Sequence, residues 1–203
     1  MAETNQTSRL EAFCDGVFAI ALTLLIIDIK IPPTEKINTT ADFWLALKHI
    51  IPSIFAFILS FIIILITWVN HHNSLKLVNK SSSAFIYANG FMLLTVVFIP
   101  FPSSLVGEYI LTDHAAPAVV LYNSTLALQA ISWILVTTAV LKHHLGKNER
   151  SIRTVHSNRQ FGYFAFILYS VCAVIGIWFP FTIAIITTIT WIFWLIWGVG
   201  LKH

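Results

Sequence analysis

Six long apolar segments separated by polar ones dominate this sequence of 203 residues. A transmembrane helix needs about 20 apolar residues, because each residue advances about 1.5 Å across a hydrocarbon core about 30 Å thick. Only 10% of the residues are charged, whereas a soluble domain carries about 25%. We therefore predict an all-α integral membrane protein with six transmembrane helices: Phe13–Ile29, Ile50–Val69, Ala84–Phe101, Ala118–Leu141, Phe161–Phe179 and Thr182–Leu201.

The last two apolar segments nearly touch, so a single long helix is the alternative there. Pro180 favours a break between them, because proline has no N–H and cannot continue a helix. No internal repeat, linker or low-complexity segment divides the chain, and residues 1–203 are predicted to form one six-helix unit. The polar first ten residues do not resemble a signal peptide, and none is expected.

Basic residues mark alternate connecting segments. With the N-terminus in the cytosol, the outside segments hold only Lys30, Lys36 and Lys48. The positive-inside rule therefore places both termini in the cytosol. The formal charge of +3 follows from this asymmetry and indicates no nucleic-acid partner; the basic stretch Lys142–Arg159 is expected to lie beside anionic lipid. The inside segments hold Arg9, Lys76, Lys80, Lys142, Lys147, Arg150, Arg153, Arg159 and Lys202.

The first apolar segment has two different faces when it is drawn as a helix at about 100° per residue. One face carries bulky apolar side chains and a single hydroxyl; it consists of Phe13, Gly16, Ile20, Leu24 and Ile27, with Thr23 beside them. Such a stripe most often packs against other helices, and lining a pore is the alternative. Asp15 lies about 140° away from Ile20. A carboxylate inside a span either pairs with a neighbouring helix or serves function directly.

Further polar residues fall inside or beside the predicted spans. The adjacent His71 and His72 point about 100° apart on a helix, which disfavours a shared metal or haem, and no metal or cofactor is expected. Asp28 either draws cations to the outer mouth of such a pore or is an interfacial residue with Lys30 nearby. The amides Asn89, Asn123 and Gln129 are expected to form interhelical hydrogen bonds.

The chain carries Arg9, Phe13, Cys14 and Asp15 near its start, then the run from Trp68 to His72, and then FMLLTVVFIPFPSSLVGEY. These three stretches resemble the transmembrane protein 175 family, the lysosomal-type potassium channels. Arg9, Phe13, Cys14 and Asp15, followed by GVFAIALTLLIIDIKIP, are similar to the RxxxFSD signature of the family, with Cys14 in place of the usual Ser. A thiol is a weaker hydrogen-bond partner than a hydroxyl. Trp68, Asn70, His71 and His72 resemble the end of its second helix, and FMLLTVVFIPFPSSLVGEY resembles the end of its third. The resemblance covers the first half of the chain.

The resemblance implies a homotetramer in a prokaryotic plasma membrane, with the four first helices around the central axis. The sequence has no TVGYG loop, so a carbonyl-lined selectivity filter is not available. The family instead narrows its pore with an isoleucine five residues after the signature Asp, which falls on Ile20. Leu24 and Ile27 form the next layers, and Thr23 beside them contributes selectivity.

The resemblance also implies a structural network near the cytosolic face. Its members are Arg9, Phe13, Cys14, Asp15, Trp68, His71 and His72. Either histidine can join Arg9 and Asp15, and His71 is preferred.

The function expected from this resemblance is a potassium-selective cation channel, with potassium ions as transient occupants of the pore. The alternative is a proton-coupled secondary transporter that uses Asp15 and His71. Transporters often carry broken helices in matching halves, and this sequence shows no such pair. A membrane enzyme or cytochrome needs convergent catalytic or ligating side chains, and the sequence presents no such set, so no enzymatic activity is expected.

Overall fold

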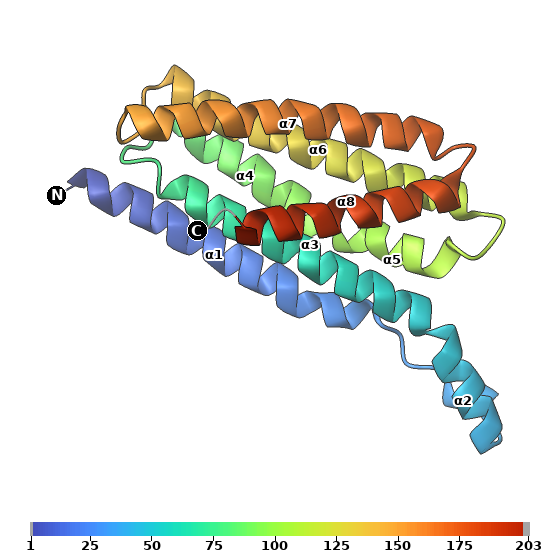
Figure 1. Cartoon of the computed structure of the whole chain (residues 1–203). Helices are drawn as coiled ribbons and strands as arrows, with labels where there is room; N and C mark the ends of the chain where they lie inside the picture. Colours follow the sequence, from blue (N-terminus) through green and yellow to red (C-terminus); the bar gives the residue numbers. More distant parts are fainter. Residues whose placement is uncertain (1, 201–203) are drawn as a thin grey trace.

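The structure, a computed structural model, describes the backbone of residues 2–200 and the side chains in that range except those of residues 2–6, Asp28, Lys36 and 197–200. The predicted roles of Asp28 and Lys202 therefore lie outside the described side chains. The described part of the chain consists of helices and the connections between them, with one isolated bridge between Val78 and Gly146 and no strand, and this confirms the all-α prediction (Figure 1). Its elements are α1 (Ala2–Leu24), η1 (Leu25–Asp28), η2 (Thr34–Lys36), α2 (Thr40–His49), α3 (Ile51–Leu75), α4 (Ser83–Phe98), α5 (Pro100–Tyr109), α6 (Ala115–Lys142), α7 (Glu149–Ile175) and α8 (Pro180–Gly200).

The first four predicted spans coincide with helical stretches that are long and apolar enough to cross a membrane. The fifth predicted span lies in α7, which is 27 residues long and begins with a polar segment. The sixth lies in α8, and the part of α8 that is described in full, Pro180–Ile196, is shorter than each of the four qualifying stretches. Within the described residues, the four qualifying stretches are Thr7–Ile27, Thr40–Leu75, Ser83–Tyr109 and Ala115–Lys142.

Several helix boundaries differ from the sequence prediction. Helix α1 begins at Ala2 rather than Phe13, and its end tightens into the 3₁₀ turn η1. The separate helix α2 precedes α3 and was not predicted. Its start is fixed by a capping box, in which the Thr39 hydroxyl accepts from Asp42 N at 3.1 Å and the Asp42 carboxylate accepts from Thr39 N at 2.9 Å.

Prolines lie at one break within a predicted span and at one break between two predicted spans. The third span is split at Ile99 into α4 and α5, because Pro100 and Pro102 cannot donate backbone hydrogen bonds. The predicted break near Pro180 is confirmed, since α7 ends at Ile175 and α8 begins at Pro180. The alternative in which the fifth and sixth predicted spans form one long helix is therefore wrong.

The helices alternate in direction, so that the basic connecting segments gather at one end. The start of α1, the α3–α4 connection and the α6–α7 connection lie together there, whereas α2 and the α7–α8 turn lie at the opposite end (Figure 1). Two backbone hydrogen bonds tie the two basic connections to each other: Asn79 N donates to Leu145 O at 3.1 Å, and Lys147 N donates to Leu77 O at 2.9 Å. This arrangement is the one predicted for the cytosolic segments.

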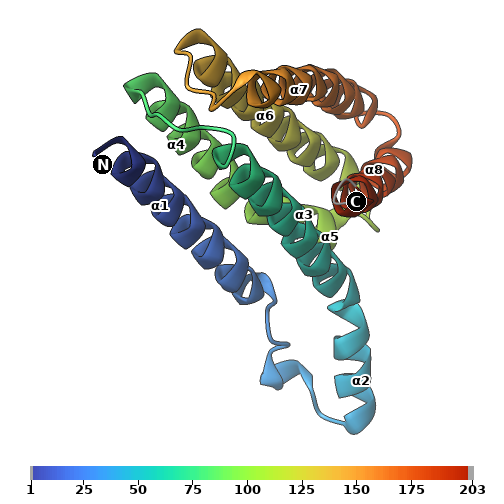
Figure 2. The same cartoon turned by 60° about the vertical axis from the view of Figure 1, so that its left-hand side comes forward.

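Helix α1 lies at the edge of the bundle, where it packs against α3 and α4 (Figure 2). Helix α6 lies more centrally and packs against α4, α5, α7 and α8. Buried polar side chains join these helices, since Gln129 Nε2 donates to Thr67 Oγ1 at 2.9 Å and Thr187 Oγ1 donates to Asn123 Oδ1 at 3.0 Å. The expected interhelical hydrogen bonds of these two amides are confirmed.

Candidate pore face and the polar cluster behind it

One face of α1 is left uncovered by the rest of the chain. Ile20, Leu24 and Ile27 are 58%, 53% and 69% exposed. Phe13, about two helical turns before Ile20, is exposed as well. The opposite face packs into the core through Cys14, Phe18, Ala21 and Leu25, all of which are buried. The structure thus places the stripe predicted from the sequence on the free side of an edge helix.

Thr23 lies on the same uncovered side. Its Oγ1 donates to the backbone oxygens of Ala19 and Ile20, both at 3.0 Å. A hydroxyl has one proton and two lone pairs. Because the proton is directed to the helix backbone, the lone pairs of Oγ1 remain available to an external donor or cation.

Asp15 lies on the side of α1 that faces α3. Trp68 Nε1 donates a hydrogen bond of 2.8 Å to Asp15 Oδ1. The Trp68 ring also stacks on the His72 ring, with centroids 5.8 Å apart and planes 25° apart. One tryptophan therefore holds both a carboxylate of α1 and an imidazole of its own helix.

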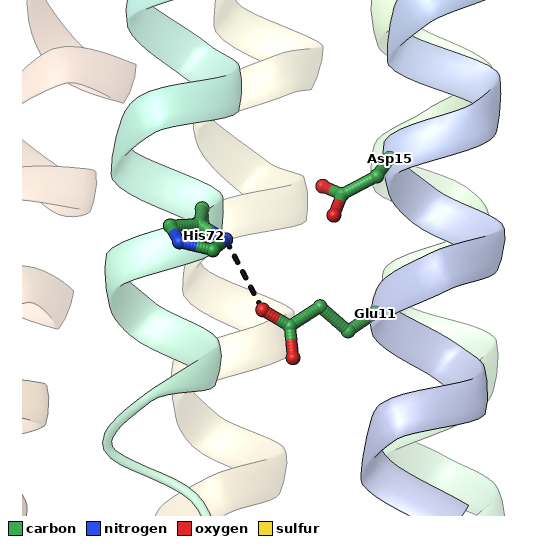
Figure 3. A group of neighbouring side chains, drawn as sticks. All are labelled: Glu11, Asp15 and His72. Atoms are coloured by element: carbon green, nitrogen blue, oxygen red, sulfur yellow. Dashed lines mark ion pairs between the residues drawn. The ribbon is translucent and has the colours of Figure 1, made fainter.

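Glu11 lies beside Asp15 and His72. We call Glu11, Asp15 and His72 the polar cluster. The Nδ1 atom of His72 lies 3.1 Å from Glu11 Oε1, and Figure 3 shows both carboxylates reaching from α1 toward the His72 ring on α3. One potential ligand atom from each of the three residues lies within 4.8 Å of the others. Glu11 was not predicted as a site residue, although its spacing of four residues from Asp15 places the two carboxylates on one helix face.

His71 belongs to a different polar pair. It is buried, and its Nε2–H donates to Asn89 Oδ1 on α4 at 2.7 Å. Its ring packs against those of Phe18 and Trp133. The preference for His71 as the partner of Asp15 is therefore corrected: His72 lies in the polar cluster, because neighbouring residues of α3 face different helices.

The remaining predicted members of the network are dispersed. Arg9 is exposed, and no ion pair joins it to Asp15 among the described residues. Phe13 lies on the uncovered face, and Cys14 is fully buried in the apolar core. Within one chain, the structure thus brings Asp15, Trp68 and His72 together but does not bring Arg9, Phe13 or Cys14 to them.

Comparison with known proteins now identifies the family. The family model described as the endosomal/lysosomal potassium channel TMEM175 matches residues 9–100. A potassium channel of Streptomyces collinus is 41% identical over 143 residues, which cover 68% of this chain and 68% of that protein. The chain belongs to the TMEM175 family.

Two further comparisons agree with this assignment. A potassium channel of Chamaesiphon minutus is 46% identical over 120 residues, which span 59% of this chain and 59% of that channel. The crystal structure of a lysosomal potassium-selective channel TMEM175 homolog from Chamaesiphon minutus superposes with a TM-score of 0.78 at 32% identity, and the match covers 94% of this chain and 98% of that one. The resemblance inferred from the sequence is therefore confirmed, and the fold is that of TMEM175 channels.

The hydrogen bond between Trp68 and Asp15 generates a stability prediction. Trp68→Phe keeps an aromatic ring for stacking on His72 but removes the donor to Asp15. We expect the free energy of unfolding to fall by about 1–3 kcal/mol, the usual cost of leaving a polar group without its hydrogen-bond partner. Thermal unfolding of the purified protein in detergent measures the change.

The matched control is Trp178→Phe, because the Trp178 side chain is exposed at the α7–α8 turn. That substitution should change the free energy by no more than about 0.5 kcal/mol. Equal stability of the Trp68→Phe variant and the unsubstituted protein would contradict a stabilising role for the hydrogen bond.

Proposed function

We propose that the chain is one subunit of a potassium-selective cation channel whose pore is lined by the uncovered face of α1. The observation that carries the proposal is the division of α1 into a buried face and an apolar face that its own chain leaves free. The relatives from Streptomyces and Chamaesiphon are both named potassium channels. Because this protein shares their family and fold, the same function is the one we favour.

The proposed assembly is a homotetramer with four copies of α1 around the axis. A single α1 offers only one wall of a pore, so an ion path through this surface needs several copies of the chain. The position of α1 at the edge of the bundle leaves it free to meet such copies (Figure 2). We further propose six transmembrane spans, both termini in the cytosol and a location in the prokaryotic plasma membrane, because the basic connections share one end.

In this assembly Ile20 forms a hydrophobic constriction, and Leu24 and Ile27 form the layers beyond it. Isoleucine side chains offer an ion no ligands, so a permeating ion must keep much of its water or cross a dry gap. Sodium holds its water more strongly than potassium and therefore meets the higher barrier. Potassium occupies the pore only in transit, and no cofactor takes part.

Thr23 is proposed to ease the approach of potassium. Its hydroxyl proton is directed to the backbone of Ala19 and Ile20, which leaves oxygen lone pairs for the ion or its water. A ring of such oxygens beside a hydrophobic constriction favours the cation that loses water more readily.

Recording from the reconstituted protein in a planar bilayer tests the function directly. With potassium and sodium on opposite sides, we expect unitary current steps and a reversal potential set mainly by potassium. The competing proton-coupled transporter would give no unitary steps and a current that depends on the proton gradient. No hydrogen bond or ion pair joins Asp15 to His71 in the described part of the chain, so no specific observation favours that alternative.

The proposed assembly predicts a particle of four chains. Mass measurement of the protein in detergent or lipid nanodiscs should give four times the chain mass of 22.9 kDa, corrected for bound detergent or lipid. A particle of one chain that still conducts would contradict a pore shared between subunits.

The proposed constriction predicts the effect of Ile20→Asn. A ring of amides should wet the dry gap, raise the total current and move the permeability ratio of potassium to sodium toward 1. Reversal potentials under biionic conditions give the ratio. Ile167→Asn is the matched control, because Ile167 is 61% exposed against 58% for Ile20 but lies on α7. If Ile20→Asn alters neither current nor reversal potential, the constriction does not lie on α1.

The proposed role of the hydroxyl predicts the effect of Thr23→Ala. The permeability ratio of potassium to sodium should fall by about fivefold, which corresponds to about 1 kcal/mol, the net worth of one hydrogen bond. Ile20 still keeps the constriction hydrophobic, so the total current should change little. The control is Thr190→Ala on α8, where the hydroxyl likewise donates to the backbone oxygen four residues earlier, at 2.6 Å. Equal shifts in both variants would mean that Thr23 acts through helix structure rather than on the ion.

A further inference from the structure

The polar cluster of Glu11, Asp15 and His72 carries an inference that is independent of ion permeation. Two carboxylates and an imidazole converge from two different helices, and their ligand atoms lie within 4.8 Å of one another. We propose that this cluster is a binding site for a divalent transition-metal ion such as Zn²⁺, which would join α1 to α3 at the end of the bundle that holds the basic connections.

The geometry at His72 is the first argument. Its Nδ1 atom is shielded from solvent and satisfied by no hydrogen bond, although Glu11 Oε1 lies 3.1 Å away. In a neutral imidazole with its proton on Nε2, the Nδ1 lone pair and the carboxylate oxygen repel each other. Either a proton on Nδ1 or a cation that both atoms coordinate removes this conflict. Two ligands of one tetrahedral metal, each at about 2.1 Å, would lie about 3.4 Å apart.

The donor set is the second argument. One imidazole nitrogen and two carboxylate oxygens suit Zn²⁺ and its first-row neighbours, whereas Mg²⁺ and Ca²⁺ prefer oxygen ligands alone. Three protein ligands leave a fourth position for water. The side chains of Glu11 and His72 are each 33% exposed, so solvent reaches the cluster and an ion can enter without unfolding the bundle.

The surroundings of the cluster are the third argument. Ligating carboxylates are usually held by hydrogen bonds from outside the metal's own ligands. Trp68 Nε1 holds Asp15 Oδ1 in this way, and its ring stacks on His72. Asp15 keeps its second oxygen for a metal. Trp68 thus orients two of the three ligands.

The competing occupant of the cluster is a proton on His72, which would form an ordinary ion pair with Glu11. The two occupants use different residues. A proton on His72 pairs with Glu11 alone, whereas a Zn²⁺ ion would also use Asp15 as a ligand. Asp15→Asn separates the two cases, since the amide oxygen still accepts from Trp68 while the negative charge is lost.

The test is calorimetric titration of ZnCl₂ into the purified full chain in lipid nanodiscs, after removal of bound metal with a chelator. We expect one saturable Zn²⁺ site per chain, and we expect MgCl₂ at the same concentrations to give no such site. Glu11→Gln, His72→Gln and Asp15→Asn should each weaken Zn²⁺ binding by more than about tenfold. His114→Gln is the control, because His114 is exposed in the α5–α6 connection at the other end of the bundle.

A second measurement guards against variants that fail to fold. Zn²⁺ should raise the melting temperature of the unsubstituted protein and of His114→Gln, because a ligand that binds only the folded state stabilises it. The same addition should leave the melting temperature of His72→Gln unchanged. Absence of saturable Zn²⁺ binding to the unsubstituted protein would overturn the proposal. Retention of full affinity in Asp15→Asn would show that Asp15 is not a ligand and would overturn the three-residue site.

Discussion

The packing of α1 on α3 and α4 determines which surface this protein presents. In a membrane, apolar residues gain little by leaving lipid for protein, so close packing and a few polar contacts decide how a helix is rotated. Phe18 and Cys14 fill the interface from the α1 side, and the bond from Trp68 to Asp15 fixes the rotation near one end. Rotation of α1 by half a turn would bury Ile20 and turn the carboxylate of Asp15 toward the uncovered side of the helix.

The sequence predicts this division of α1 because periodicity is a local property. Ile20, Leu24 and Ile27 fall on one face of any helix that contains them, whatever surrounds it. The helical spans follow from hydropathy in the same way. Helix α2 was missed because its ten residues are short and carry charges, although Thr39 and Asp42 form a recognisable capping box.

The partners of His71 and His72 could not be predicted by such reasoning. Adjacent residues on α3 point to different neighbours, and the sequence does not specify that α4 supplies Asn89 to one and α1 supplies Glu11 to the other. Those contacts depend on how three helices are rotated against one another. Arg9 was placed in the network by resemblance to the family signature, and in a single chain its side chain is exposed.

The 3₁₀ turn at the end of α1 has a consequence for how its last exposed side chains are arranged. Residues three apart are staggered in an α-helix but eclipse each other in a 3₁₀ helix. The turn runs from Leu25 to Asp28, directly after Leu24, so Ile27 lies almost straight above Leu24 along the helix axis. In the proposed assembly around a shared axis, these two side chains would form columns along it, whereas Ile20 and Leu24 would follow the spiral of the α-helix. A pore lining built from α1 would therefore change from helical to columnar within one turn.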